Sequence, residues 1–148
     1  MDTQKKSVDK LNELLEKNYD AEQGYRNAAE DTNNSLIKKF LLDHSKERYD
    51  FGHQLKDEIT KLGGKPDKGT SLTADIHRKW MDLKTAIAGN SDKAVIEECE
   101  RGERAALQDY KEVLEEGLLP ESAGNIVQSQ YEKIKSALAR LENLETVL

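Results

Sequence analysis

The segment from Ser91 to Gly117 scans as one uninterrupted helix with an apolar stripe. Its apolar residues recur at intervals of three and four, the spacing that keeps one face of a helix buried. They are Val95, Ile96, Cys99, Ala106, Leu107, Tyr110, Val113 and Leu114. Glu100 and Glu103 fall within or beside that face, although carboxylates are rarely buried unless they are paired, hydrogen-bonded or bound to a metal. These two acids are the strongest functional signal in the sequence.

A first long helix is predicted from about Lys5 to Asp31. It has the same periodicity, and it also directs a carboxylate, Glu22, toward its apolar side. The short polar link of residues 31–35 follows, with side chains that can cap the next helix. Because the link is so short, the next helix must turn back antiparallel to the first.

A second long helix is predicted from about Ser35 to Leu62, where Gly63-Gly64 supplies a strong stop signal. On its apolar face, His44 and Glu47 stand where further leucines would be expected. Asp50 follows Glu47 at the i, i+3 spacing that lets two ligands converge on one metal ion. This helix therefore adds two more acids to the candidate site.

Residues 64–90 are predicted to form a long crossover that contains a short helix from about Leu72 to Ala88. Trp80 lies on the apolar face of that short helix and is expected to cover one side or end of the core, whereas His77 is expected to be exposed or at a cap. After a tight turn at Pro120, a last long helix runs to the end of the chain.

The order of these elements predicts an all-α fold, a ferritin-like four-helix bundle forming a single domain over residues 1–148. Two antiparallel hairpins joined by one long crossover are typical of ferritin-like connectivity, and the crossover here carries the short extra helix.

Composition excludes several classes of protein. The net charge of −6 and the absence of a long run of Lys and Arg argue against a nucleic-acid partner. No apolar run approaches the ~20 residues needed to cross a bilayer, and the first residues lack the apolar centre of a secretory signal. Cys99 is the only cysteine, so no intrachain disulfide forms, and its place on the stripe favours a buried hydrophobe. We expect a cytoplasmic protein with no nucleic-acid or membrane partner.

Over nearly its whole length the chain resembles an uncharacterised bacterial family of ferritin-like four-helix-bundle proteins known as a domain of unknown function. The matching stretches are LNELLEKNYDAEQGYRNAAED, SKERYDFGHQLKDEITKLGG, HRKWMDLKTAI, EECERGERAALQDY and SQYEKIKSAL. The resemblance implies the fold and makes a stress-linked bacterial role plausible, but it carries no established activity.

The wider ferritin-like superfamily binds two iron or manganese ions through one Glu from each of two helices and a Glu-x-x-His pair from each of the others. The ligands that the resemblance implies in this chain are Glu22, Glu47, Asp50, Glu103 and, as an extra carboxylate, Glu100. Asp50 stands where the paired histidine should be. The last helix breaks the pattern, because its inward face offers Gln130 and apolar residues but no Glu-x-x-His pair.

Three functions remain open. The working hypothesis is a non-catalytic bundle with a degenerate site, whose inward acids are satisfied by tyrosines, Gln130, His44 or buried Lys and Arg. The second is a protein that binds or buffers one metal ion, for which oxygen ligands suit Mn, Mg, Ca or Fe. The third is a carboxylate-bridged di-iron or di-manganese oxidoreductase, which the incomplete fourth helix argues against. The leucine-rich residues 138–148 could also seal a homodimer, although the core of one domain explains them equally well.

Overall fold

The computed structural model describes residues 2–68 and 74–147, without the side chains of residues 2, 74–77 and 79. These residues form five helices and no strand, so the all-α prediction is confirmed for them. The helices are α1 (Asp2–Asp31), α2 (Ser35–Lys61), α3 (Ala74–Ala88), α4 (Asp92–Glu116) and α5 (Glu121–Val147). All five elements were predicted from the sequence, with bounds that agree to within one helical turn.

Local chemistry explains where α2 and α4 begin and end. The side chain of Asn34 accepts hydrogen bonds from the backbone N–H groups of Leu36 and Ile37 at 2.9 and 3.2 Å, which caps α2. Ser91 caps α4 by accepting from the N–H of Ala94 at 3.2 Å. Helix α4 ends at Gly117, whose φ of 66° lies in the left-handed region that glycine tolerates best.

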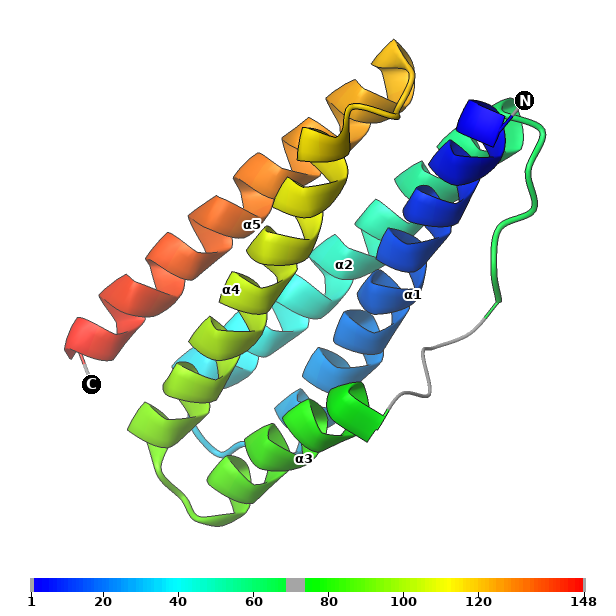
Figure 1. Cartoon of the computed structure of the whole chain (residues 1–148). Coiled ribbons are helices and arrows are strands. Elements are labelled where there is room, and N and C mark those ends of the chain that lie inside the picture. Colours follow the sequence, from blue (N-terminus) through cyan, green and yellow to red (C-terminus); the bar gives the residue numbers. More distant parts are fainter. Residues whose placement is uncertain (1, 69–73, 148) are drawn as a thin grey trace.

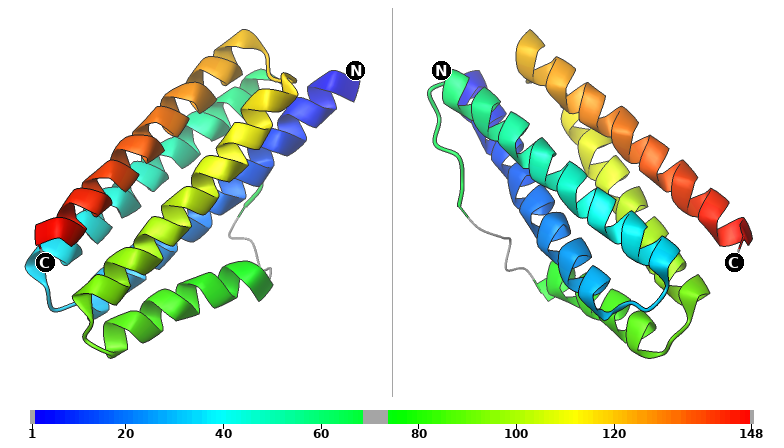
Figure 2. Two further views of the ribbon diagram at one scale, coloured as in Figure 1. Left: turned by 60° about the vertical axis from the view of Figure 1, so that its left-hand side comes forward. Right: turned by 180° about the vertical axis from the view of Figure 1, so that it is seen from behind.

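The four long helices run side by side as two antiparallel hairpins, α1 with α2 and α4 with α5 (Figure 1). Helix α3 lies across α1 and α4 at one end of the molecule (Figure 2). Helix α4 faces α1 and α5 faces α2, so that the hairpins enclose a common interior. None of the described helices is both long and apolar enough to span a membrane.

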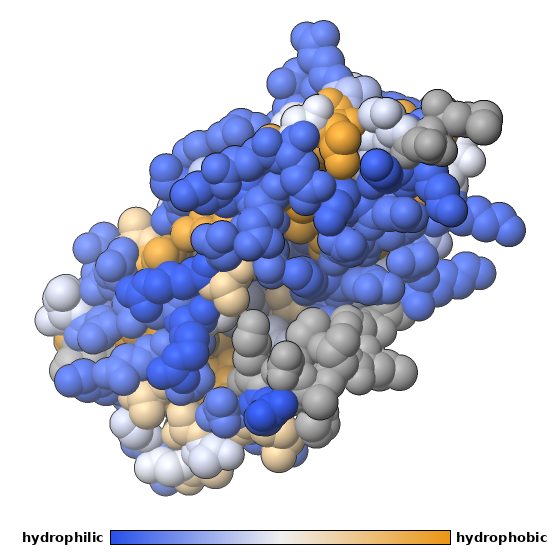
Figure 3. Space-filling model, in the orientation of Figure 1, coloured by the Kyte–Doolittle hydropathy of each residue, from blue (hydrophilic) through white to orange (hydrophobic). Residues whose placement is uncertain are grey.

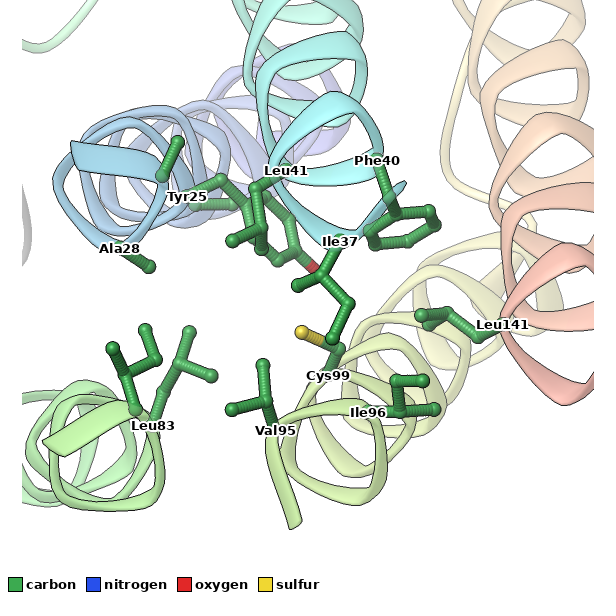
Figure 4. Close-up of a cluster of buried hydrophobic side chains, with 13 residues drawn as sticks. Tyr25, Ala28, Ile37, Phe40, Leu41, Leu83, Val95, Ile96, Cys99 and Leu141 are labelled. Atoms are coloured by element: carbon green, nitrogen blue, oxygen red, sulfur yellow. The ribbon is translucent and has the colours of Figure 1, made fainter. Parts of the chain in front are cut away.

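The interior contains two apolar clusters, separated along the helix axes. One, here called the α3 cluster, lies at the end covered by α3, and its side chains converge from several helices in Figure 4. It comprises Ala21, Tyr25, Ala28, Ala29, Ile37, Phe40, Leu41, Leu83, Ile87, Val95, Ile96, Cys99 and Leu141. The other, here called the far cluster, comprises Leu11, Leu14, Leu15, Phe51, Leu55, Ile59, Tyr110, Val113, Ala123, Val127 and Ile134. The face shown in Figure 3 is mostly hydrophilic, as expected when the apolar stripes turn inward.

Helix α3 is held against the rest of the molecule by Trp80, Leu83 and Ile87, which pack on the α3 cluster. This confirms the prediction that Trp80 covers one end of the core. The indole lies so close to α1 that a Cβ at Gly24 would come within 2.3 Å of its ring carbons, and therefore only glycine fits there. The predicted exposure of His77 lies outside the described residues.

Candidate functional site

Buried polar side chains occupy the region where the two apolar clusters meet. Each of the four long helices contributes at least one, and each is at most 4% exposed. This set, called the polar belt below, consists of Asn18 and Tyr25 on α1, Arg48 on α2, Glu103 and Tyr110 on α4, and Gln130 on α5.

The centre of the polar belt is an ion pair between Arg48 and Glu103. Nη2 of Arg48 donates to Oε2 of Glu103 at 2.8 Å, and the two side chains are 4% and 0% exposed. The other carboxylate oxygen, Oε1, accepts a hydrogen bond from the hydroxyl of Tyr25. Nη1 of Arg48 donates to Oδ1 of Asn18 at 3.2 Å. Both oxygens of Glu103 are therefore bound by the protein's own donors, as buried charges require.

Hydrogen bonds continue from this pair to α5. Asn18 donates through Nδ2 to the hydroxyl of Tyr110 at 2.8 Å, and Tyr110 donates to Oε1 of Gln130 at 2.7 Å. Nε2 of Gln130 donates to Oε1 of Gln54 at 2.9 Å and to the carbonyl of Phe51 at 3.2 Å. The polar belt thus links all four long helices through one connected network, which is the arrangement that makes buried polar groups tolerable.

Arg48 and the two tyrosines of the polar belt keep their protons at neutral pH. Burial works to lower the pKa of Arg48, but Glu103 and the neighbouring tyrosines outweigh it, so that the pKa is raised overall. Burial, and secondarily Glu103, holds the pKa of Tyr25 well above its usual range. Burial also raises the pKa of Tyr110 to about 12. Arg48 therefore stays charged and both hydroxyls remain donors.

A second polar feature lies on α2 beside the polar belt. His44 is 2% exposed, and its Nδ1 lies 2.8 Å from the carbonyl of Phe40. Burial lowers the pKa of His44, and a carbonyl partner requires Nδ1 to carry the proton, so Nε2 presents a lone pair. That Nε2 and the buried Oε1 of Glu47 have no hydrogen-bond partner among the described residues. Burial raises the pKa of Glu47, which is half-buried.

Two of the predicted metal ligands pair with a basic residue of their own helix. Glu22 is half-buried at the edge of α1, where its carboxylate lies 3.4 Å from Arg26. Asp50 is exposed and pairs with Lys46 at 3.2 Å, so it does not converge with Glu47 on the interior. Both carboxylates are neutralised by a basic residue one turn away on their own helix.

Glu100 is buried, at 5% exposure, but it faces α5 and not the polar belt. Burial, followed by contact with and repulsion from Glu145 on α5, raises its pKa to about 7. Of the predicted ligands, Glu103 is therefore in the polar belt, Glu100 lies against Glu145 of α5 and Asp50 is exposed. In the part of the chain that the structure describes, no three side chains among His, Cys, Asp and Glu come together as metal ligands would.

Arg48 is central to the polar belt but was not predicted from the sequence to be part of the site. It lies seven positions after Leu41 and seven before Leu55, two fully buried leucines of the same stripe. That heptad spacing predicts an inward side chain. The sequence pattern was interpreted as placing Glu47 on this face, but Arg48 is buried and Glu47 is only half-buried. The general expectation that inward acids would be satisfied by tyrosine and buried basic partners is confirmed at Glu103.

Comparison with known proteins identifies a matching family, but the description of that family names no activity. A family model described as "Domain of unknown function (DUF2383)" matches residues 6–116, which include α4 and most of α1 and exclude α5. Three of the four long helices, and with them Arg48, Glu103 and Tyr25, fall inside the match. No curated protein matches the sequence.

Proposed function

Because the chain belongs to a family described only as a domain of unknown function, we propose its function from the geometry of its interior. The protein is a ferritin-like four-helix bundle without catalytic activity, in which the guanidinium of Arg48 takes the place of a metal ion. The observation that carries this proposal is the fully buried ion pair between Arg48 and Glu103.

The fold assignment is supported by connectivity. Two antiparallel hairpins joined by one long connection, here residues 62–91 with α3 within it, are the arrangement of ferritin-like proteins, not of bundles with only short loops. Ferritin-like metal centres lie in the interior, between carboxylates of facing helices. The polar belt also lies between facing helices, and it shares Tyr25 with the α3 cluster and Tyr110 with the far cluster.

The donor set does not fit a two-metal centre. Glu103 already uses both oxygens, for Arg48 and Tyr25. A divalent cation next to Arg48 would meet a fixed positive charge at short range, and such repulsion amounts to several kcal/mol even at an effective dielectric constant of about 20. Glu22 and Asp50 already pair with Arg26 and Lys46 of their own helices. The same positive charge that neutralises Glu103 therefore disfavours a metal ion.

Elemental analysis tests the proposal directly. The protein would be expressed with added iron or manganese and purified without chelator, and we expect close to no metal per chain. Addition of Mn²⁺ or Fe²⁺ should leave the melting temperature unchanged, because a ligand that binds only the folded state must raise it. Two metal ions per chain would contradict the proposal.

A second function, the binding of one metal ion, is favoured by a separate observation. Nε2 of His44 and Oε1 of Glu47 are buried one turn apart on α2 and lack partners among the described side chains. An imidazole lone pair and a carboxylate oxygen are both metal donors. This alternative predicts one ion per chain, loss of that ion in Glu47→Ala, and retention in the matched control Asp50→Ala, which changes an exposed acid of the same helix.

A further inference from the structure

A cavity of about 440 Å³ opens between α1, α3 and α4. Cavities of ~300–1,000 Å³ are the size of small-molecule sites. Of the described residues that line it, none belongs to α5 and Arg48 alone belongs to α2. The surface on the side of α3 and α4 is hollowed near its centre (Figure 3). The cavity therefore reaches from the surface to the edge of the polar belt.

The wall formed by α4 is built from small residues. It carries Gly102, Ala105 and Ala106, and Ala21 of α1 also lines the cavity. Within the part of the chain that the structure describes, a Cβ added at Gly102 would meet no neighbouring atom within 4 Å. Glycine makes a helix less stable than alanine does, yet close packing does not require a glycine here. The space beside Gly102 is thus available to a ligand.

Much of the wall is apolar surface that is not covered by the protein itself. Ala105, Ala106 and Trp80 line the cavity and are only half-buried, and Leu83 and Cys99 lie deeper in the same wall. Apolar surface in contact with water is unfavourable, and covering it with another apolar surface is favourable. The wall therefore favours a ligand that presents apolar atoms to it.

The polar groups at the deep end of the cavity are already bound to one another. The hydroxyl of Tyr25 donates to Glu103, and Arg48 donates to both Glu103 and Asn18. Burial raises the pKa of Cys99, so its thiol is uncharged at neutral pH. A polar ligand placed here would compete with hydrogen bonds that the protein has already made, whereas an apolar ligand would leave them intact.

Most charged side chains of the lining have a partner of opposite charge. Each of the three basic residues of the lining pairs with an acid, and one further acid of the lining pairs with a neighbouring lysine. The pairs are Lys17 with Asp109, Arg48 with Glu103, Arg101 with Glu98, and Glu13 with Lys10. A charged ligand would have to displace one of these partners, so the pairs give no preference for an ion.

The remaining acids of the lining do not select an ion either. Asp20 interacts with another group, and Asp82 is exposed and solvated by water. Burial, followed by a hydrogen bond with Asp67, raises the pKa of Glu16, as expected where carboxyl groups lie close together. These acids repel an anion, but none of them is a buried carboxylate waiting for a cation.

We propose that the cavity binds an uncharged, mainly apolar small molecule. The ligand covers Ala105, Ala106 and the accessible part of Trp80 and fills the space beside Gly102. This proposal goes beyond the proposed function and does not depend on whether the interior holds a metal ion.

Trp80 supplies a built-in probe, because it is the only tryptophan in the chain. The uncharged dye N-phenyl-1-naphthylamine becomes fluorescent in apolar surroundings and accepts excitation energy from tryptophan. Titration of the dye into the folded protein should give a saturable rise in dye emission together with a saturable fall in Trp80 emission. The absence of a saturable response would overturn the proposal.

Displacement of the dye tests the choice of an uncharged ligand. Three compounds share one naphthalene ring system and differ in charge: 2-naphthalenemethanol, 2-naphthalenesulfonate and (2-naphthylmethyl)trimethylammonium. At about 0.15 M salt, where charges more than ~8 Å away are screened, the alcohol should displace the dye. The sulfonate and the ammonium should each require at least tenfold higher concentrations. Displacement by either ion as readily as by the alcohol would overturn the proposal.

A pair of glycine variants tests the location. Gly102→Leu fills the cavity from α4, and we expect at least tenfold weaker binding of N-phenyl-1-naphthylamine. Gly124→Leu is the matched control, because Gly124 is also in a helix with no described neighbouring atom within 4 Å of an added Cβ but does not line the cavity. This control should bind as the wild type does. Thermal unfolding followed by circular dichroism establishes that both variants fold, and unchanged binding in a folded Gly102→Leu would place the ligand elsewhere and overturn the proposal.

Discussion

Glu103 and Glu100 lie one turn apart on α4 and are both buried, yet their surroundings are opposite in charge. Glu103 faces α1 and α2, where Arg48 and Tyr25 donate to it. Glu100 faces α5, where the carboxylate of Glu145 lies against it and the pKa rises to about 7. A buried carboxylate is therefore not by itself evidence of a metal site. The groups on the facing helix decide whether it is held as an ion or as an acid.

The two regions should also respond differently to pH. In the middle of the molecule, the pKa values of Arg48 and Tyr25 are both raised, so neither group changes charge near neutral pH. The contact between α4 and α5 does contain a group that changes charge there, Glu100. Substitutions at each place can test this contrast.

The largest effect is expected for Arg48→Met, which leaves Glu103 buried without its positive partner. Removing one member of a buried ion pair typically lowers the free energy of unfolding by about 3–5 kcal/mol. Urea unfolding followed by circular dichroism measures it. The double variant Arg48→Met with Glu103→Gln removes the stranded charge as well, so it should recover a large part of the loss. A double variant as unstable as the sum of the two single variants would show that the two side chains do not interact.

A smaller effect is expected for Tyr25→Phe. The substitution keeps the ring but removes the hydroxyl that donates to Glu103, and hydrogen bonds to charged groups contribute about 1.5–3 kcal/mol. The free energy of unfolding should fall by about 2 kcal/mol, measured in the same way. Tyr49→Phe is the control, because Tyr49 is exposed and should change stability by under ~0.5 kcal/mol. Equal effects at both tyrosines would contradict the role given to Tyr25.

Glu100→Gln should change the pH dependence of stability. Because the folded state raises the pKa of Glu100 from 4.5 to about 7, folding favours the protonated form. Its stabilising contribution is complete below the ordinary pKa and is lost as pH rises through 7. The contribution of Glu100 should therefore be lost between pH 5 and pH 8.

The glutamine variant cannot ionise, so it should be more stable than the wild type at pH 8 by on the order of 1 kcal/mol, and close to it at pH 5. Glu47 also has a raised pKa and acts in the same direction, whereas the lowered pKa of His44 acts in the opposite direction, so the difference between the variant and the wild type isolates Glu100. Urea midpoints at the two pH values measure the difference. A difference in stability between the variant and the wild type that is the same at pH 5 and pH 8 would contradict the pairing of Glu100 with Glu145.

The smallest effect is expected for Asp50→Ala. Asp50 forms an exposed ion pair with Lys46 on the same helix, and such pairs contribute about 0.3–0.5 kcal/mol. The melting temperature should therefore remain close to that of the wild type. A large loss of stability would show that Asp50 takes part in the interior after all.

The helices could be predicted from the sequence because the signals are local. Apolar spacing, the Ser91 and Asn34 caps and the glycine at position 117 are all read within a few residues. These signals determine each helix before any packing is known. The connectivity then follows from the lengths of the links.

The site could be predicted only in part, because the direction in which a side chain points around the helix axis, and not only its spacing along the sequence, decides whether it is buried. Successive residues differ by about 100° around a helix, so Arg48 lies about 100° from Glu47 and Asp50 lies about 60° from Glu47 on the other side. The buried direction of α2 is nearer Arg48, which leaves Glu47 half-buried and Asp50 exposed. The identity of the partner was beyond local reading, since Arg48 and Glu103 are 55 positions apart in the chain.

The contact between Gly24 and Trp80 has a consequence for how this chain can vary. An indole that leaves no room for a methyl group makes two positions on different helices interdependent. A residue with a side chain can replace Gly24 only after Trp80 has been replaced by a smaller residue. Conversely, a tryptophan can be acquired at position 80 only when position 24 is glycine. Among homologous chains, these two sites should therefore covary as a pair.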